Sequence, residues 1–171
     1  MQTEKTKEHE WLKNFLGDWT AKGEAPTGPD QPPMTWSASE SGQLLGDIWL
    51  QVNGKHDMPD GNPASTQFTL GYDTNKKKFV GSWLGTMMDY FWVYEGELSA
   101  DGKVLTLDST GPRMDEPGKM AKYQDIHTFV SNTHRILTSQ YQDDNGNWQQ
   151  FMEYEKAAMR CVKGSVVGVR C

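Results

Sequence analysis

The feature that most constrains this chain is the segment 78–98, KFVGSWLGTMMDYFWVYEGEL. It contains two tryptophans, two tyrosines, two phenylalanines and two methionines. Leaving such side chains in water would forgo roughly 1.5–3 kcal/mol of burial free energy for each of them. The segment must therefore fill a core or line a pocket, and we interpret it as the wall of a binding cavity.

The segment divides into two runs that alternate with period two around a turn near 84–86, which predicts a pair of β-strands. One face of the second run ends in Glu95 and Glu97, so we expect the other face to point inward. Buried tyrosine hydroxyls and indole N–H groups need partners, which a cavity holding water or a polar ligand group supplies. The predicted inner face comprises Phe79, Gly81, Trp83, Tyr90, Trp92, Tyr94 and Gly96.

Short strand-like segments recur at regular spacing along the chain. No proline occurs between Pro63 and Pro112, so consecutive strands can pair there without interruption. Turn-forming residues predict long loops at 26–33, 54–63 and 111–118. The other predicted strands span 19–24, 35–44, 47–53, 65–72, 103–108, 122–130, 135–141 and 148–155. About ten short antiparallel strands predict an all-β fold, and an up-and-down β-barrel is favoured over a sandwich because closure removes exposed edges.

A short amphipathic helix is expected over 6–16, before the strands. Thr6 suits its N-cap and Gly17 its end. The apolar side of this helix needs a surface to cover, and one open end of the barrel provides it. That side carries Trp11, Leu12, Phe15 and Leu16.

We expect one domain over 1–171, with the barrel at 18–156 and a C-terminal tail at 157–171. The tail breaks the strand pattern. Its valines are compatible with one added edge strand, and they are Val166, Val167 and Val169.

Charge and composition limit the classes of partner that this chain can have. The net charge is -6, and the 17 basic residues include only one short run, at 76–78 in a predicted turn, so nucleic acid is not an expected partner. The charged first ten residues are not a secretory signal, and no apolar run approaches membrane-spanning length. We therefore expect a cytoplasmic protein without membrane contact. Cys161 and Cys171 are spaced neither as a metal knuckle nor as a disulfide framework, so free thiols are expected.

Several sequence blocks occur here in one order: LGDW at 16–19, LGYD at 70–73, KFVGSW at 78–83, the pair Met87 and Met88, and WVYEGEL at 92–98. Gly111-Pro112, YQD at 123–125 and NWQQFMEYEK at 147–156 follow them. Together these blocks resemble the bacterial domain of unknown function 1579 family over about residues 8–156. The resemblance implies a lipocalin-like, calycin-type barrel with a cavity and no established activity. The tail from Ala157 departs from the family pattern.

Four histidines raise the question of a metal or haem site. His127 and His134 fall on the two arms of one hairpin, in a register that places His127 opposite Leu137 or its neighbour, so the two do not share a metal. A lone inward histidine is compatible with haem, but the flanking sequence does not resemble haem-binding barrels. We therefore expect neither a metal nor a cofactor. His9 on the helix and His56 in a loop are interpreted as surface residues.

Acid–base chemistry in the cavity would require carboxylates or histidines among the aromatic side chains. Asp125 and His127 alternate along one strand, so they lie side by side on one face and form a candidate acid–base pair. We favour the alternative that Asp125 forms a buried ion pair with Arg135 on the neighbouring strand. The remaining polar candidates are Glu40 and Asp89.

These observations predict a non-enzymatic protein that binds a small apolar or aromatic molecule inside the barrel. One alternative is a barrel enzyme that acts on a small hydrophobic substrate through Asp125 and His127. Another is an interaction module with a filled core, and a homo-oligomer is compatible with each reading. The predicted ligand-binding residues are Phe68, Leu70, Trp83, Met88, Tyr90, Trp92, Tyr94, Tyr123, Asp125, His127 and Arg135.

Overall fold

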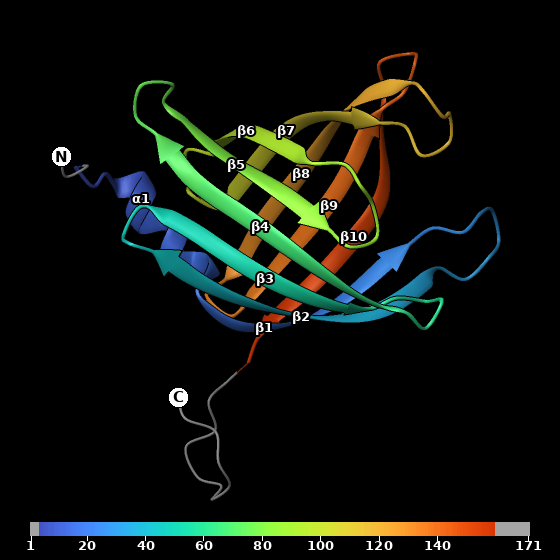
Figure 1. Ribbon diagram of the computed structural model, residues 1–171, viewed down its shortest axis with the longest axis horizontal. Coiled ribbons are helices and arrows are strands. Elements are labelled where there is room, and N and C mark those ends of the chain that lie inside the picture. The colour runs from blue at the N-terminus through green and yellow to red at the C-terminus, as the bar shows by residue number, and fades with distance from the viewer. Residues whose placement is uncertain (1–3, 160–171) are drawn as a thin grey trace, which may run out of the picture.

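Ten antiparallel strands follow one another around a closed barrel in the computed structural model, which describes residues 4–159 (Figure 1). Each strand pairs with its neighbours in sequence, and β1 pairs with β10 to close the sheet. The predicted up-and-down barrel is confirmed. The strands are β1 Gly17–Ala25, β2 Met34–Leu45, β3 Trp49–Asp57, β4 Pro63–Asp73, β5 Lys78–Gly85, β6 Trp92–Leu98, β7 Val104–Pro112, β8 Met120–Ser131, β9 His134–Gln142 and β10 Trp148–Ala158.

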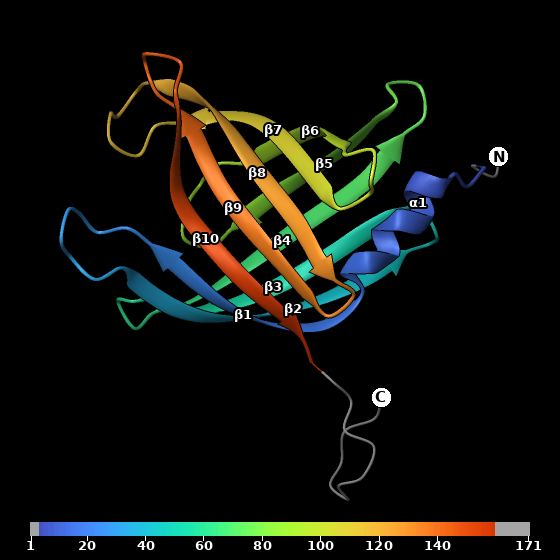
Figure 2. The ribbon, with the colours of Figure 1, turned by 180° about the vertical axis from the view of Figure 1, so that it is seen from behind.

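The two ends of the barrel differ (Figures 1 and 2). Because the strands alternate in direction, every second connection lies at the same end. One end, here called the loop end, carries the longer connections, and the other carries short turns and the N-terminal helical segment. The connections at the loop end are 26–33, 58–62, 86–91, 113–119 and 143–147.

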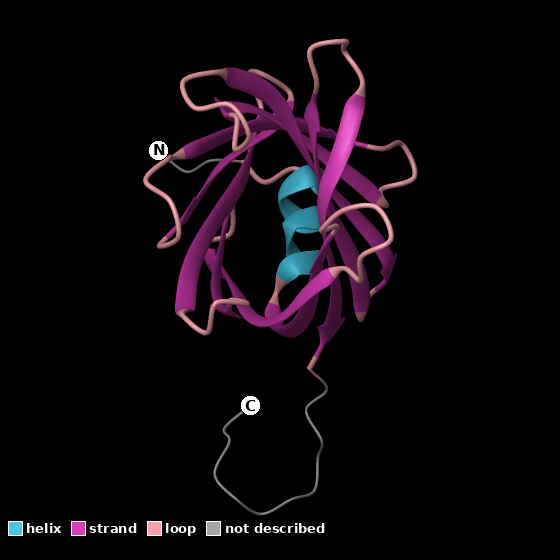
Figure 3. Cartoon of the chain, turned by 90° about the vertical axis from the view of Figure 1, so that its right-hand side faces the viewer, coloured by secondary structure: helices cyan, strands magenta, loops and turns pink. Residues whose placement is uncertain are grey.

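The N-terminal helical segment closes the end opposite the loops. It consists of α1 (Lys7–Trp11) and the 3-10 turn η1 (Leu12–Phe15), here together called the plug. Seen through the barrel from the loop end, the plug lies across the far opening (Figure 3). Leu12 and Phe15 are 0% and 1% exposed, so each contributes roughly 1.5–3 kcal/mol of burial free energy. The predicted capping helix is confirmed, although its last turn tightens to 3-10 geometry.

A glycine allows the plug to approach β2 closely. A Cβ atom added to Gly42 would lie 2.2 Å from the backbone oxygen of Phe15. Because that neighbour is backbone rather than a movable side chain, any larger residue would displace the plug.

His9 lies inside this arrangement, so its expected surface position is wrong. The residue is 2% exposed, and its ring packs edge-on against Tyr72 with the ring centroids 6.0 Å apart. The backbone N–H of Thr6 donates to its Nδ1 at 3.1 Å, which ties the histidine to the start of the helix. Because His9 lies one turn before Leu12, it extends the buried side of the helix that the amphipathic pattern predicted.

Two strand boundaries also differ from the prediction. β3 continues to Asp57, so the expected loop at 54–63 shrinks to 58–62. Gly54 is a strand residue paired with both Glu40 and Thr66, and pairing on two sides overrides the turn preference of the Asn-Gly dipeptide. The connection after β5 is longer than the predicted turn, spanning 86–91.

Part of the predicted tail continues the sheet, because β10 extends to Ala158. The possible edge strand at Val166, Val167 and Val169 and the predicted free thiols at Cys161 and Cys171 lie outside the described residues. Within residues 4–159, no helix is long and apolar enough to cross a membrane.

Candidate functional site

The barrel contains a cavity of about 430 Å³. It extends from Phe15 of the plug to Met58, Met87 and Met114 in three connections at the loop end. Small-molecule pockets have volumes of roughly 300–1,000 Å³, and this cavity falls within that range. A barrel with a filled core would lack such a space.

Nine of the eleven predicted binding residues line this cavity. They are Phe68, Trp83, Met88, Trp92, Tyr94, Tyr123, Asp125, His127 and Arg135. The inward face of the central hairpin is therefore the one that the alternation predicted. On that face, the Trp92 ring packs edge-on against Tyr123 with centroids 4.8 Å apart.

The other two predicted residues do not line the cavity. Leu70 lies one inward position closer to the plug than Phe68 and is completely buried in the core. Tyr90 precedes β6, and its hydroxyl donates to the backbone oxygen of Thr110 at 2.9 Å. The period-two pattern does not continue through Tyr90, because the connection between β5 and β6 is longer than predicted.

Methionines surround the cavity toward the loop end. Thioether side chains adapt their shape readily, which suits a wall that must fit a guest molecule. One of them, Met88, also lies 3.2 Å from the indole Nε1 of Trp92. The methionines that line the cavity are Met58, Met87, Met88, Met114 and Met152, and only Met88 is among the predicted ligand-binding residues.

A charged cluster, formed by Glu40, Arg135 and Lys156, occupies one side of the cavity. Arg135 Nη2 donates to Glu40 Oε2 at 2.7 Å, and Lys156 Nζ donates to Glu40 Oε1 at 2.5 Å. The guanidinium lies between two rings, 4.7 Å from the centroid of Phe15 and 4.4 Å from that of Trp19. The predicted ion pair between Arg135 and Asp125 is wrong, because Arg135 pairs instead with Glu40 on β2, three strands around the barrel from β9.

The electrostatics of the charged cluster are those of one carboxylate between two cations. Burial disfavours the Glu40 carboxylate, but Lys156 and then Arg135 outweigh that effect and lower its pKa. Burial also lowers the pKa of Lys156 and of Arg135, and Glu40 opposes both shifts. Each cation therefore depends on the single carboxylate for its pairing.

Asp125 accepts two short hydrogen bonds inside the cavity. The hydroxyl of Tyr94 donates to Oδ2 and that of Ser139 donates to Oδ1, each at 2.5 Å. Burial raises the pKa of Asp125 despite these two donors, and burial with the nearby Asp125 raises the pKa of Tyr94 well above its usual value. The carboxyl is thus held by hydroxyl groups, not by a cation.

His127 stands apart from Asp125. Its ring stacks on Phe68 with centroids 5.6 Å apart, and its Nδ1 has no hydrogen-bond partner within the part of the chain that the structure describes. Burial lowers its pKa well below 6.5, so the ring is neutral at pH 7. No hydrogen bond joins the two side chains among the described residues, and the structure does not bring them together as the acid–base pair that the sequence suggested.

A hydrogen-bonded chain across β2, β3, β4 and β10 includes His56, whose predicted surface position is wrong. Trp36 Nε1 donates to the hydroxyl of Tyr154 at 2.7 Å, and that hydroxyl shares a hydrogen bond of 3.0 Å with His56 Nδ1. His56 Nε2 shares a hydrogen bond of 3.1 Å with Thr66 Oγ1. Burial lowers the pKa of His56 and raises that of Tyr154 to about 12. The sequence missed His56 because it placed the residue in a loop.

Lys156 and Tyr154 were also missed, although the sequence carries a signal for both. They alternate with Met152 along β10, which places all three on the inward face. The expected register of the preceding hairpin is confirmed, since His127 pairs opposite Leu137. Within residues 4–159, no three His, Cys, Asp or Glu side chains converge as a metal-ligand set would.

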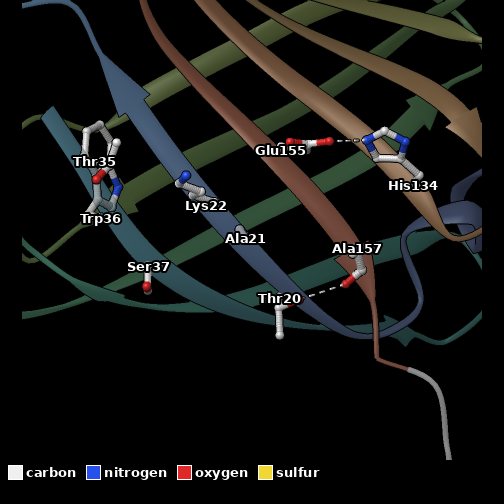
Figure 4. A pocket seen from close by; sticks show the side chains of 9 residues that line it. All are labelled: Thr20, Ala21, Lys22, Thr35, Trp36, Ser37, His134, Glu155 and Ala157. Atoms are coloured by element: carbon white, nitrogen blue, oxygen red, sulfur yellow. Dashed lines mark hydrogen bonds and ion pairs between the residues drawn. The ribbon is translucent and has the colours of Figure 1, made fainter. Parts of the chain in front are cut away.

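A second hollow, of about 650 Å³, lies on the outside of the barrel over β1, β2, β9 and β10 (Figure 4). Two of its polar side chains have a neighbour within the wall: His134 Nε2 lies 3.1 Å from Glu155, and Thr20 donates to the backbone oxygen of Ala157 at 3.4 Å. Figure 4 shows the lining side chains spread along four strands without converging on one point. Although larger, this hollow is open to solvent, so the interior cavity is the candidate site.

A family model described as "Protein of unknown function (DUF1579)" matches residues 4–157. The chain belongs to the DUF1579 family. The match spans the plug and nearly all of the barrel, as the sequence blocks indicated. No match to this DUF1579 chain was found among curated proteins.

Solved structures share the fold of this DUF1579 chain. Rv2717c from M. tuberculosis superposes with a TM-score of 0.62 at 15% identity, covering 92% of this chain and 100% of that one. The S-type phycobiliprotein lyase CPES from Guillardia theta gives a TM-score of 0.59 at 10% identity, covering 89% and 92%. At these identities the likeness concerns the barrel architecture alone.

Proposed function

We propose that this DUF1579 protein is a non-enzymatic binding protein that holds a small apolar or aromatic molecule inside its barrel. The observation that supports the proposal is the cavity of about 430 Å³ with a predominantly aromatic and methionine wall. Small-molecule pockets combine such apolar walls with a few polar groups that orient the ligand. In this cavity those groups are the charged cluster, Asp125 with its two hydroxyl donors, and the chain through His56.

The arrangement of the wall favours binding over a purely structural role. Trp83 and Trp92 lie near the loop end, and Phe15 closes the far end, so an apolar guest would contact rings along the whole cavity. Aromatic surfaces contribute burial free energy and geometric fit to a guest molecule. The likeness to the phycobiliprotein lyase supports the barrel only, and the proposal depends on the cavity itself.

Binding of N-phenyl-1-naphthylamine, a neutral apolar fluorophore, to two variants tests the proposal. The substituted side chain points into the cavity in one variant and away from the barrel in the other. Leu137 lines the cavity, whereas its neighbour Ile136 lies on the outer face of β9. Leu137→Trp should weaken binding of the fluorophore tenfold or more by filling the space, while Ile136→Trp should leave binding unchanged.

Circular dichroism should show that both variants keep the barrel. Equal affinity of the wild type and Leu137→Trp for the fluorophore would place the bound molecule outside the cavity. Equal loss in both variants would mean that binding does not depend on the interior wall. Either result contradicts the proposal.

A further inference from the structure

We infer that the ligand of this cavity is a monoanion, an apolar molecule that ends in a carboxylate held by Arg135 and Lys156. The inference rests on the proposed function and specifies the chemical class of the ligand.

The first observation is an excess of hydrogen-bond donors. A guanidinium carries five N–H donors and an ammonium three, and neither group accepts hydrogen bonds. Within the described chain, the Arg135 and Lys156 side chains make two hydrogen bonds, both to Glu40. Arg135 Nε and Nη1 are buried and make no hydrogen bond with residues 4–159, although the guanidinium lies over the rings of Phe15 and Trp19. One carboxylate therefore serves two cationic groups, and most of their donors lack acceptors.

The second observation is an excess of positive charge. Glu40 supplies one negative charge, and Arg135 with Lys156 supplies two positive charges, so the charged cluster carries a net charge of +1. The two cations are buried, with side-chain exposed fractions of 1% for Arg135 and 4% for Lys156, and Glu40 is 11% exposed. A buried charge without a counterion is costly, so an anion entering the cavity would gain from meeting this cluster.

The other titratable groups that face the cavity do not remove this excess. Asp125 forms no ion pair with either cation among the described residues, and its two oxygens already accept from Tyr94 and Ser139. Burial raises the pKa of Asp125, which disfavours its charged form. His56 and His127 are kept neutral by burial, which lowers their pKa values. Asp125, the second carboxyl group in the cavity, thus acts on Lys156 only through space, and it leaves the buried donors of Arg135 without an acceptor.

The position of the charged cluster sets the orientation of the ligand. Arg135 packs against Phe15 of the plug, and Lys156 lies directly opposite it on β10, so both cations lie in the closed half of the barrel. Trp92 and the cavity methionines lie toward the loop end. The carboxylate therefore enters first and the apolar body follows. A single excess charge matches a monoanion, whereas a phosphate dianion would leave an unpaired negative charge in the cavity.

The test uses two probes of nearly equal shape, 2-naphthoate and 2-naphthamide, as competitors that displace N-phenyl-1-naphthylamine from the wild-type protein. A hydrogen bond to a charged group contributes enough to change affinity by roughly tenfold or more. We expect 2-naphthoate to displace the fluorophore at a concentration at least tenfold lower than 2-naphthamide. Equal displacement by both would overturn the anion inference while leaving the proposed function standing. Failure of the neutral fluorophore to bind would instead overturn the proposed function.

Variants locate the preference at the charged cluster. Lys156→Gln removes the excess positive charge, so the preference for 2-naphthoate should fall about tenfold, toward parity with the amide. Lys22→Gln makes the same change of net charge on the outer face of β1 and should keep the preference. Glu40→Gln leaves two cations unopposed and should increase it. An unchanged preference in both Lys156→Gln and Glu40→Gln would overturn the inference.

The body of the ligand is identified by a further competitor, decanoate, which has an alkyl chain in place of the fused rings. Tighter displacement by decanoate than by 2-naphthoate would indicate an alkyl carboxylate, and the reverse an aromatic one. If neither anion displaces the fluorophore, the inference is contradicted for alkyl and for aromatic carboxylates.

Discussion

Arg135 on β9 and Lys156 on β10 lie directly opposite each other in the sheet, with both cationic groups inside the barrel. Like charges at opposed sheet positions destabilise the pair unless a counterion intervenes. Glu40 provides that counterion from β2 and contacts both. Buried ion clusters contribute little net stability, because desolvation offsets the attraction. This relationship therefore favours a binding role for the charged cluster over a purely structural one.

Gly42→Ala should weaken the contact between the plug and β2. The added methyl would meet the backbone oxygen of Phe15 at 2.2 Å, so we expect a loss of about 1–3 kcal/mol in the free energy of unfolding. Urea unfolding followed by tryptophan emission measures this change. Ser41→Ala, one residue away on the outer face, is the control and should change stability by less than about 0.5 kcal/mol. Equal stability of the two variants would show that the close approach is not required.

Trp92→Ala should reduce both stability and binding. The ring is 7% exposed and packs against Tyr123, so its loss should cost about 3–5 kcal/mol in the free energy of unfolding. Removing part of the cavity wall should also weaken binding of N-phenyl-1-naphthylamine. The control is Phe91→Ala, since Phe91 is 56% exposed. A stable Trp92→Ala protein with full affinity would contradict the placement of this ring.

Tyr94→Phe should leave Asp125 with one hydroxyl donor instead of two. The lost hydrogen bond spans 2.5 Å in a buried site, so we expect a cost of about 1–3 kcal/mol at pH 7. The pKa of Asp125 should rise further, because its charged form loses a donor. Tyr90→Phe serves as the comparison, since that hydroxyl donates to a backbone oxygen in an exposed position. If both substitutions cost the same, the Tyr94–Asp125 hydrogen bond has no special contribution.

Stability should fall as the pH decreases from 7 to 5. Burial lowers the pKa of His127 from 6.5, so below that pH the unfolded chain binds a proton that the folded chain does not. Stability then decreases by up to about 1.4 kcal/mol per pH unit for this group. His127→Phe keeps a flat ring beside Phe68 and should reduce the slope, as measured by urea unfolding at each pH. The opposite effect of Asp125, whose pKa is raised, remains in both proteins. Identical slopes would rule out a titrating His127.

Local periodicity predicted most of the fold. Alternation identified the strands and the inward face of the central hairpin, since neighbours along a strand point to opposite faces. The turn preference of the Asn-Gly dipeptide misplaced Gly54 in a loop, because that preference holds only where no neighbouring strands pair with the dipeptide. The pattern within one hairpin also fixed the pairing of His127 with Leu137.

The charged cluster could not be predicted in the same way. Glu40 lies 95 positions from Arg135 and 116 from Lys156 along the chain. Periodicity indicates that each side chain points inward, but it does not indicate which side chains meet across a closed barrel. That depends on how far the strands are staggered around the barrel, and no local sequence pattern determines this stagger. The sequence therefore offered Asp125 as the partner of Arg135, because it lies on the neighbouring strand.

The central claim is that an apolar molecule binds inside the barrel, and the methionine methyl groups report on it directly. With ¹³C-labelled methionine methyls, N-phenyl-1-naphthylamine should shift the NMR signals of the cavity methionines, which are Met58, Met87, Met88, Met114 and Met152. The exposed Met34, Met120 and Met159, which do not line the cavity, should keep their signals unchanged. Saturable shifts confined to the cavity set are the predicted result. Shifts confined to the exposed set, or no shifts in either set, would contradict the claim.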